Sequence, residues 1–170
     1  LPQSDGSMVR LTVAAKSRVA VLELHDPRHF NALSPEMADD VQQAVMWLRS
    51  QPVSKVKAVV LQGCGPHFCP GGNLSRLSTP GLTQTARARC SLDLFAGFVA
   101  LRTLAVPVVS AVHGTVLGGG LAIALHSDCV VSSKDATFQH GELTRGLTPA
   151  ALFTRSMSEV AGHSIAVQFY

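Results

Sequence analysis

Two short runs rich in valine and leucine open the chain, within residues 8–24, on either side of the turn-like sequence Ala15–Lys16–Ser17. Apolar runs of this length joined by a short polar segment are typical of two antiparallel strands. The pattern therefore predicts a β-hairpin at the start of the chain.

A helix is predicted next, over residues 35–50. Ser34 followed by Pro35 is the pattern of a helix N-cap with a proline in the first turn. Apolar residues then recur at helical spacing, so that one face of the helix is expected to pack on a core. These residues are Met37, Val41, Val45 and Leu48.

Helices and apolar strands alternate through the remaining sequence. Buried strands are predicted over residues 56–62, 107–113 and 129–132, and helices near residues 87–104, 121–126 and 150–161. Residues 114–120 are predicted to form a glycine-rich turn. Residues 74–86, rich in Ser, Thr, Pro and Gly, lack periodicity and predict a mobile loop. The alternation predicts an α/β fold with stacked or parallel sheets.

The composition supports a packed core. Hydrophobic residues make up 46% of the 170 residues and charged residues 15%, which excludes a disordered chain. The same balance predicts some apolar surface that another subunit or segment covers. Residues 1–7 are expected to be a linker and residues 8–170 a single core domain.

The charge pattern argues against a nucleic-acid partner. The net charge is +3, no run of Lys or Arg stands out, and the chain has one Trp and one Tyr. Mild basicity suits an anionic small ligand such as a phosphorylated cofactor, although it also fits ordinary surface charge.

The four cysteines show neither CxxC spacing nor a zinc-type framework with histidine, so no metal is expected. They favour a reduced, intracellular protein. No apolar run reaches membrane-spanning length and no secretory leader pattern opens the chain, so a membrane partner is not expected.

The most informative segment is PVVSAVHGTVLGGGLAIAL, in which an apolar strand leads through three consecutive glycines, Gly118 to Gly120, into an apolar helix. Glycines permit a tight turn and leave backbone N–H groups open to an anion or a developing oxyanion. A close-packed turn between strand and helix explains the same glycines. The spacing does not match the GxGxxG, GK[ST] or GxSxG motifs, which argues against nucleotide binding and a hydrolase serine.

Another glycine turn lies earlier in the chain, after the strand predicted over residues 56–62, in HFCPGGNLSRL at Gly71 and Gly72. In chain order this is the first glycine turn, and the turn at residues 118–120 is the second. Two such turns offer a pair of N–H donors, which suits an acyl-thioester oxygen that becomes an enolate. An ordinary β-turn is the alternative at this site.

Glu142 lies among apolar residues in a passage from strand to loop. Such a carboxylate has a raised pKa and can act as a general acid or base. The alternative is a surface glutamate paired with Arg145. His67, His113 and His140 lie in the same segments but not at metal spacing, so loop or core roles are expected for them.

Together these segments resemble the crotonase (enoyl-CoA hydratase/isomerase) superfamily. The resemblance extends from RVAVLELHDPRHFNALS through KAVVLQGCGPHFCPGGN and AVPVVSAVHGTVLGGGLAIALHSDCVVSS to ATFQHGELTRGLTPA. It implies a β-β-α spiral of stacked sheets that assembles into trimers or hexamers. The family subunit is longer, so the C-terminal helices that close the acyl pocket and build the trimer are expected to be missing here.

The resemblance also implies roles for individual residues. Gly72 and Gly119 would donate the two oxyanion-hole N–H groups, and Glu142 falls on the second of the two hydratase glutamates. The adenine end of coenzyme A would lie at Arg28, Phe30 and Ala32, with Gly71 beside it. No prosthetic group is implied, since coenzyme A or phosphopantetheine arrives as part of an acyl-CoA or acyl-carrier-protein substrate.

The departures from the family pattern reduce the number of reactions to be expected. The first hydratase glutamate aligns with Ala122, which cannot transfer a proton, and Asn73 and Pro70 replace residues usual at the first glycine turn. A lone glutamate resembles certain enoyl-CoA isomerases and the dehydratases of polyketide β-branching cassettes. The sequence thus predicts an enoyl hydratase, dehydratase or isomerase that uses one general acid/base.

Two alternatives remain open. One is a decarboxylase of glutaconyl-type thioesters, although Arg76 stands where such family members carry a lysine. The other is a catalytically degenerate binding or scaffold module that kept the fold.

Overall fold

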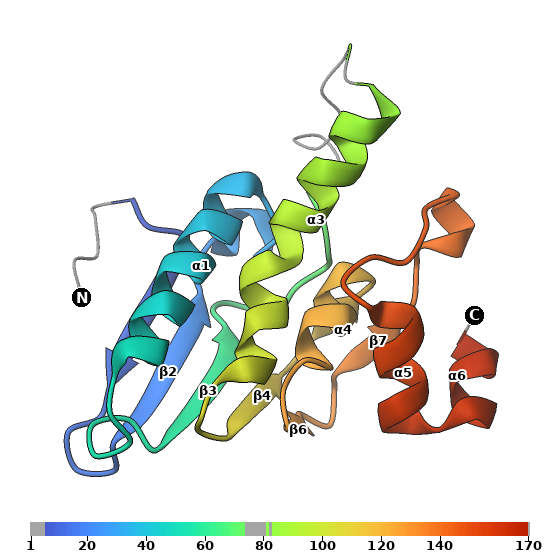
Figure 1. Ribbon diagram of the computed structural model, residues 1–170. Helices are drawn as coiled ribbons and strands as arrows, with labels where there is room; N and C mark the ends of the chain where they lie inside the picture. The colour runs from blue at the N-terminus through green and yellow to red at the C-terminus, as the bar shows by residue number, and fades with distance from the viewer. Residues whose placement is uncertain (1–5, 74–80, 82, 170) are drawn as a thin grey trace.

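The computed structural model describes residues 6–73, 81 and 83–169, and its centre is a five-stranded sheet (Figure 1). The strands run in the order β1 (Val9–Val13), β2 (Val19–Leu24), β3 (Ala58–Gly63), β4 (Val108–Val112) and β6 (Cys129–Ser132). The first pair is antiparallel and every later pair is parallel. A small second sheet pairs β5 (Thr115–Leu117) with β7 (Thr137–Gln139) in parallel.

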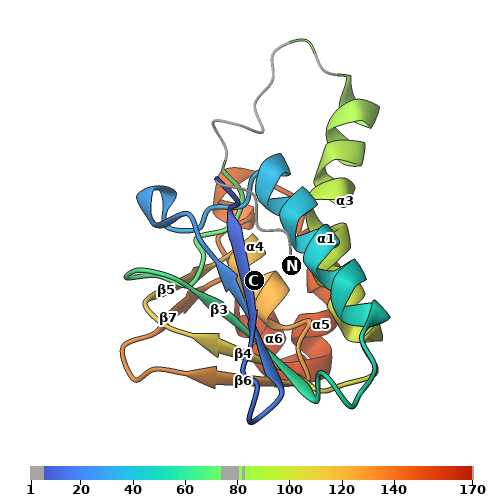
Figure 2. The ribbon, with the colours of Figure 1, turned by 90° about the vertical axis from the view of Figure 1, so that its left-hand side faces the viewer.

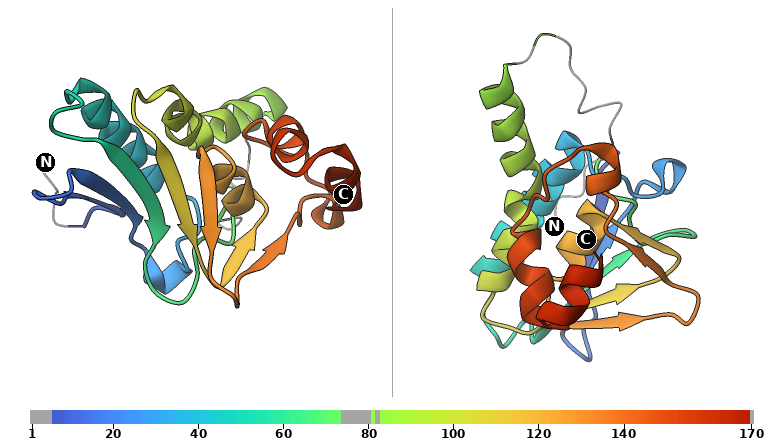
Figure 3. Two further views of the ribbon diagram at one scale, coloured as in Figure 1. Left: turned by 90° about the horizontal axis from the view of Figure 1, so that it is seen from below. Right: turned by 90° about the vertical axis from the view of Figure 1, so that its right-hand side faces the viewer.

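Two long helices lie side by side along one face of the large sheet (Figures 1 and 3). They are α1 (Pro35–Ser50) and α3 (Gln84–Ala100). Shorter helices follow the strands nearer the C-terminus: α4 (Gly119–Ala124), α5 (Phe153–Ala161) and α6 (His163–Phe169). Three 3₁₀ turns complete the described elements: η1 (Pro27–His29), η2 (Leu101–Thr103) and η3 (Leu143–Arg145). Among the described residues, no helix is long and apolar enough to cross a membrane.

Local signals explain the first elements. The hairpin forms as predicted, with β1 and β2 joined through the turn at residues 15–17. Helix α1 begins at Pro35 because the Ser34 hydroxyl accepts a hydrogen bond from the Met37 N–H at 3.3 Å. All four residues of the predicted apolar face are buried in the core against the sheet, so this prediction is confirmed.

The central strands are mostly apolar, and their burial alternates. In β2, β3 and β4 every second residue is buried and the intervening ones are half-buried. Helices α1 and α3 cover one face of this sheet (Figure 2), and the buried residues of the strands share one core with those of the two helices. This covering explains a sequence with no strict polar alternation.

Several predicted boundaries are wrong. Residues 114–120 were expected to be a turn, but Thr115–Leu117 form β5. The helix expected from residue 121 begins at Gly119, and α6 was missed altogether. The expected mobile loop at residues 74–86 lies largely outside the described residues, and Gln84 onward is already helix α3. The expected linker also lies mostly outside them, and Ser7, which is described, bonds Asp40 of α1 at 3.0 Å.

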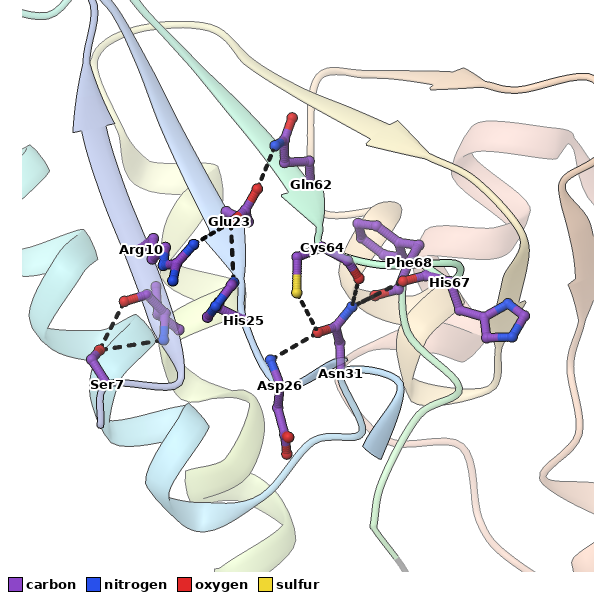
Figure 4. A network of polar contacts seen from close by, with 11 residues as sticks. Ser7, Arg10, Glu23, His25, Asp26, Asn31, Gln62, Cys64, His67 and Phe68 are labelled. Carbon is purple, nitrogen blue, oxygen red and sulfur yellow. Dashed lines mark hydrogen bonds and ion pairs between the residues drawn. The ribbon is translucent and has the colours of Figure 1, made fainter. Parts of the chain in front are cut away.

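One side chain ties the loop after β2 to the loop after β3 (Figure 4). Asn31 is fully buried, with a left-handed backbone at φ 62°. Its amide nitrogen donates to the carbonyls of Cys64 at 2.8 Å, His67 at 2.9 Å and Phe68 at 3.2 Å. Its Oδ1 accepts from the Asp26 N–H at 2.9 Å. Sequence reasoning gave Asn31 no role.

Replacing Asn31 tests this connection. Asn31→Ala removes every hydrogen bond of the side-chain amide and leaves the carbonyls that it binds without this donor. It also places alanine in a left-handed backbone that asparagine tolerates better. We expect the free energy of unfolding in urea to fall by on the order of 3 kcal/mol. Gln43→Ala, at an exposed position of α1, is the control and should change it by less than about 0.5 kcal/mol. Equal effects of the two substitutions would contradict this role.

Candidate active site

The first glycine turn is held by a short ladder with the segment that precedes α1. Leu33 and Gly72 form an isolated parallel bridge. The Leu33 N–H donates to the Gly71 carbonyl at 2.8 Å, and the Asn73 N–H donates to the Leu33 carbonyl at 2.8 Å. Both hydrogen bonds of Leu33 are made with the residues on either side of Gly72. In a parallel bridge of this kind the N–H of Gly72 itself points away from Leu33.

The second glycine turn lies between β5 and α4. Gly118 has φ 51° and ψ −116°, a conformation that side chains disfavour. Its N–H donates to the Gln139 carbonyl of β7 at 2.9 Å, which aligns the end of β5. Gly119 is the first residue of α4, and an N–H at this position has no partner within the helix.

The structure brings the two turns into contact. A Cβ placed on Gly71 would lie 3.1 Å from the Gly119 nitrogen. A Cβ placed on Gly120 would overlap the carbonyl group of Cys69. Because the Gly72 peptide follows Gly71 directly, the backbone N–H groups of Gly72 and Gly119 belong to adjoining segments.

Cys69 supports the first turn, a role that sequence reasoning missed. Its thiol is fully buried and accepts the Gly71 N–H at 3.4 Å. Burial raises the pKa of the Cys69 thiol to about 12, so the group stays protonated at neutral pH. The sequence signal was present, since Cys69 lies two residues before the glycines, but a buried cysteine usually only fills space.

Glu142 lies directly over the second turn. One carboxyl oxygen, Oε1, is 3.0 Å from where a Cβ on Gly118 would be. The side chain is only 11% exposed, so the alternative of a surface glutamate is wrong. Arg145 is instead hydrogen-bonded through Nη1 to the Gly141 carbonyl at 2.9 Å.

Burial dominates the electrostatics of Glu142. Desolvation raises the pKa of its carboxyl above the ordinary 4.5, and its own backbone N–H and the charge of Arg145 offset part of this rise. A carboxyl whose pKa is raised toward neutrality can both take up and release a proton during a reaction.

His140 accompanies Glu142 in the buried site. Its Nδ1 lies 3.1 Å from Glu142 Oε2, and its ring stacks on Phe153 at 4.7 Å between centroids, with 11° between the planes. The contact is short, although its angles are poor for a hydrogen bond. Burial lowers the pKa of the His140 imidazole, so the ring is neutral at neutral pH.

His67 and His113 have structural contacts, as predicted. His67 Nδ1 accepts the Thr115 N–H at 3.1 Å, and His113 Nε2 lies 2.9 Å from the Gly65 carbonyl. Within the described residues, no group of three or more His, Cys, Asp or Glu side chains could hold a metal ion.

Ala122 belongs to the hydrophobic core, close after the second glycine turn in the sequence. It is 1% exposed, and its N–H donates to the Gly118 carbonyl at 2.9 Å in the first turn of α4. The methyl group offers no proton at this position, so the site lacks a carboxylate there.

The segment predicted to hold coenzyme A, residues 28–32, leads to Leu33, which pairs with the first glycine turn. Arg28 is exposed on η1, and Phe30 is 49% exposed, with its ring edge-on to His67 at 5.1 Å. Ala32 is buried, one residue before the bridge from Leu33 to Gly72. The chain thus leads from the exposed Arg28 to the bridge between Leu33 and Gly72.

A groove of about 620 Å³ lies elsewhere, on the face of the large sheet turned away from α1 and α3. Glu23, Gln62, Cys64, His113 and Ser133 are among the residues that line it. None of its lining residues belongs to the glycine turns or to the Glu142 segment, so volume alone does not locate the candidate chemistry.

Comparisons with known proteins match this geometry. A family model described as enoyl-CoA hydratase/isomerase covers residues 14–170. The chain is 31% identical to a probable enoyl-CoA hydratase of Mycobacterium tuberculosis, over 91% of the chain and 59% of that protein. It is also 31% identical to the bacillaene synthase decarboxylase of Bacillus subtilis, over 94% of the chain and 61% of that protein. The chain therefore spans about 60% of the length of these relatives.

Solved structures confirm the predicted crotonase-like fold. An enoyl-CoA hydratase of Polaromonas superposes with a TM-score of 0.85 at 29% identity, over 95% of this chain and 62% of the other. A Thermobifida fusca protein named as an enoyl-CoA hydratase, solved with acetoacetyl-CoA, superposes with a TM-score of 0.81 at 25% identity, over 96% and 65%.

The contact between the two turns predicts an unequal response of two glycines. Gly120→Ala should lower the free energy of unfolding by about 3 kcal/mol, because the added methyl group meets the Cys69 backbone. Gly146→Ala is the control, since this residue has a left-handed backbone at φ 66° and ψ 26° and its methyl group would meet nothing within 4 Å. It should cost only the ~1 kcal/mol of its left-handed backbone. Urea unfolding measures both, and a Gly120→Ala variant as stable as the control would contradict the contact.

Proposed function

Because the chain belongs to the enoyl-CoA hydratase/isomerase family, we propose that it processes acyl thioesters through an enolate bound at Gly72 and Gly119. The observation that carries the proposal is the contact of the two glycine turns beneath a buried carboxylate. Two backbone N–H groups and one proton-transferring group are the minimum that enolate chemistry needs.

In the proposed reaction the thioester carbonyl oxygen accepts hydrogen bonds from the N–H groups of Gly72 and Gly119. Glu142 takes a proton from the α-carbon, and the electron pair of the broken C–H bond moves onto the thioester oxygen. Return of the proton to the γ-carbon re-forms the carbonyl and shifts the double bond. Proton and electrons balance without any further reactant.

We favour isomerisation over hydration or dehydration in which two glutamates act together on water. Ala122 leaves Glu142 without a second carboxylate across the site to share the positioning of a water molecule. A single carboxyl that takes a proton from one carbon and returns it to another needs no such partner.

The substrate carrier in this proposal is coenzyme A or a carrier-protein phosphopantetheine. The exposed Arg28 and Phe30, upstream of the Leu33–Gly72 bridge, support binding of the nucleotide end along this segment, with Ala32 and Gly71 nearer the thioester. Exposed apolar residues on α5 and α6, among them Val160, Ile165 and Val167, support an apolar surface that another subunit covers. A homotrimer or hexamer is the assembly that we propose for the whole protein.

Glu142→Gln tests the acid/base role. We expect kcat for isomerisation of a 3-enoyl thioester to fall by on the order of 10²–10⁴-fold, because the amide cannot take up the proton. Binding of acetoacetyl-CoA, measured by calorimetry, should persist because the glycine turns are unchanged. Glu159→Gln, on an exposed carboxylate bonded to Arg155, is the control and should keep full activity. Retention of full activity by Glu142→Gln would remove this residue from the mechanism.

The pH dependence gives an independent check. Glu142 must be ionised to take a proton, so kcat/KM should rise with pH along a limb that lies above pH 4.5, the ordinary pKa of a glutamate. This limb should be absent from any residual activity of Glu142→Gln. A limb at or below pH 4.5 would contradict the raised pKa.

Decarboxylation is a second candidate, favoured by the similarity to the bacillaene synthase decarboxylase. There the C–C bond to the carboxylate breaks, carbon dioxide leaves, and the electron pair passes to the thioester oxygen. Carbon dioxide release from 3-methylglutaconyl thioester distinguishes the two reactions. We expect none above background; release that Glu142→Gln retains would favour decarboxylation. Failure to bind acetoacetyl-CoA at all would favour a degenerate binding module over both enzymes.

A further inference from the structure

The contact between His140 and Glu142 has no part in the reaction described above. His140 lies two residues before Glu142, at the end of β7, and its side chain is 4% exposed. From the sequence, only a loop or core role was expected for it, as for His67 and His113. Resting on the proposed function, we infer that His140 is a positioning residue that keeps the carboxyl of Glu142 over the second glycine turn. Its Nδ1 lies 3.1 Å from Oε2 without hydrogen-bond alignment, and a small rotation brings Nδ1–H into line to donate.

The geometry fixes the imidazole from two sides. Stacking on the fully buried ring of Phe153, at the start of α5, sets the plane of the ring. The His140 carbonyl lies 3.1 Å from a Cβ placed on Gly118, and Glu142 Oε1 lies 3.0 Å from the same point. The His140 carbonyl and the Glu142 Oε1 atom therefore lie in the same space above Gly118. The second carboxyl oxygen of Glu142, Oε2, is the one nearest the imidazole of His140.

The charge states suit this role. A neutral imidazole carries one N–H, and only the Nδ1–H form can donate to the carboxylate at 3.1 Å. Arg145 is the charged group that acts on Glu142 from η3, and it lowers the pKa of that carboxyl. From α5 the contact is the apolar ring of Phe153. An N–H donor to the carboxylate favours its ionised form, so His140 opposes the effect of burial on Glu142.

His126 supplies an internal control for the tautomer. It is also buried, burial lowers its pKa, and its Nε2 lies 2.8 Å from the Ala151 carbonyl. A carbonyl only accepts, so His126 must carry its proton on Nε2. The two buried histidines should therefore be opposite tautomers.

Nitrogen-15 NMR of the histidine-labelled chain tests the contact without any activity. We expect the Nδ1–H tautomer for His140 and the Nε2–H tautomer for His126. Glu142→Gln should change the nitrogen shifts of His140 and leave those of His126 as they were. An Nε2–H tautomer at His140, or shifts that do not respond to Glu142→Gln, would overturn the inference even if the chain is an active isomerase.

Two substitutions of His140 test its effect on the proton transfer. His140→Phe keeps a ring to stack on Phe153 but removes the donor, and His140→Gln restores an N–H. We expect His140→Phe to move the acidic limb of kcat/KM to higher pH by about one unit, and His140→Gln to return it toward the wild-type position. A purely structural role would lower the rate without moving the limb, and that result would contradict the inference.

The outcomes separate this inference from the proposed function. A chain with no activity on any enoyl thioester, but with the expected tautomers and the response to Glu142→Gln, would refute the enzyme and support the contact. In the Glu142→Gln background, His140→Phe should have no further effect on rate. A further fall in rate when His140→Phe is added to Glu142→Gln would show that His140 does not act through Glu142.

Discussion

The contact between the Cys69 backbone and Gly120 is the constraint on which the rest of the site depends. Cys69 pairs with β5 on one side, through its N–H to the Thr115 carbonyl at 3.2 Å and its carbonyl to the Leu117 N–H at 3.1 Å. On its other side β5 pairs with β7, which leads directly into the Glu142 segment. A side chain at position 120 would overlap the Cys69 carbonyl group and push the Cys69 segment away from α4. One close backbone approach therefore fixes both glycine turns and the carboxyl above them.

This arrangement has a cost in stability that depends on pH. The folded pKa of Glu142 is raised above its unfolded value, so its contribution to stability is present below pH 4.5 and is lost as pH rises through the folded pKa. At neutral pH its ionised form opposes folding. His126 and His140 have lowered pKa values, and their contribution is present above pH 6.5 and is lost as pH falls. A site that needs ionised Glu142 beside neutral His140 is thus compatible with neutral pH, where Glu142 is the destabilising member.

Local patterns predicted the elements whose causes are local. The hairpin and α1 follow from apolar spacing and the Ser34 cap, and the structure confirms both. Asn31 could not be found in this way, because the carbonyls that its amide binds lie 33 to 37 residues away. The burial of Glu142 was equally hidden, since Arg145 nearby in sequence suggested a surface pair. Its true neighbour, Gly118, lies in the turn between β5 and α4. The two glycine turns were recognised as candidates by sequence, but only the fold shows that they touch.

The reaction that we propose depends on the presence of one carboxylate, at Glu142, and of alanine at position 122. Both line the second turn, one from α4 and the other from the segment after β7. A carboxylate at position 122 would have to be buried beside Glu142, and two like charges in such a place oppose each other's ionisation. With alanine there, the pKa of Glu142 is set by burial, which raises it, and by its own backbone N–H and Arg145, which lower it. That favours reactions in which one group moves one proton between two carbons, over reactions in which two carboxylates act together on water.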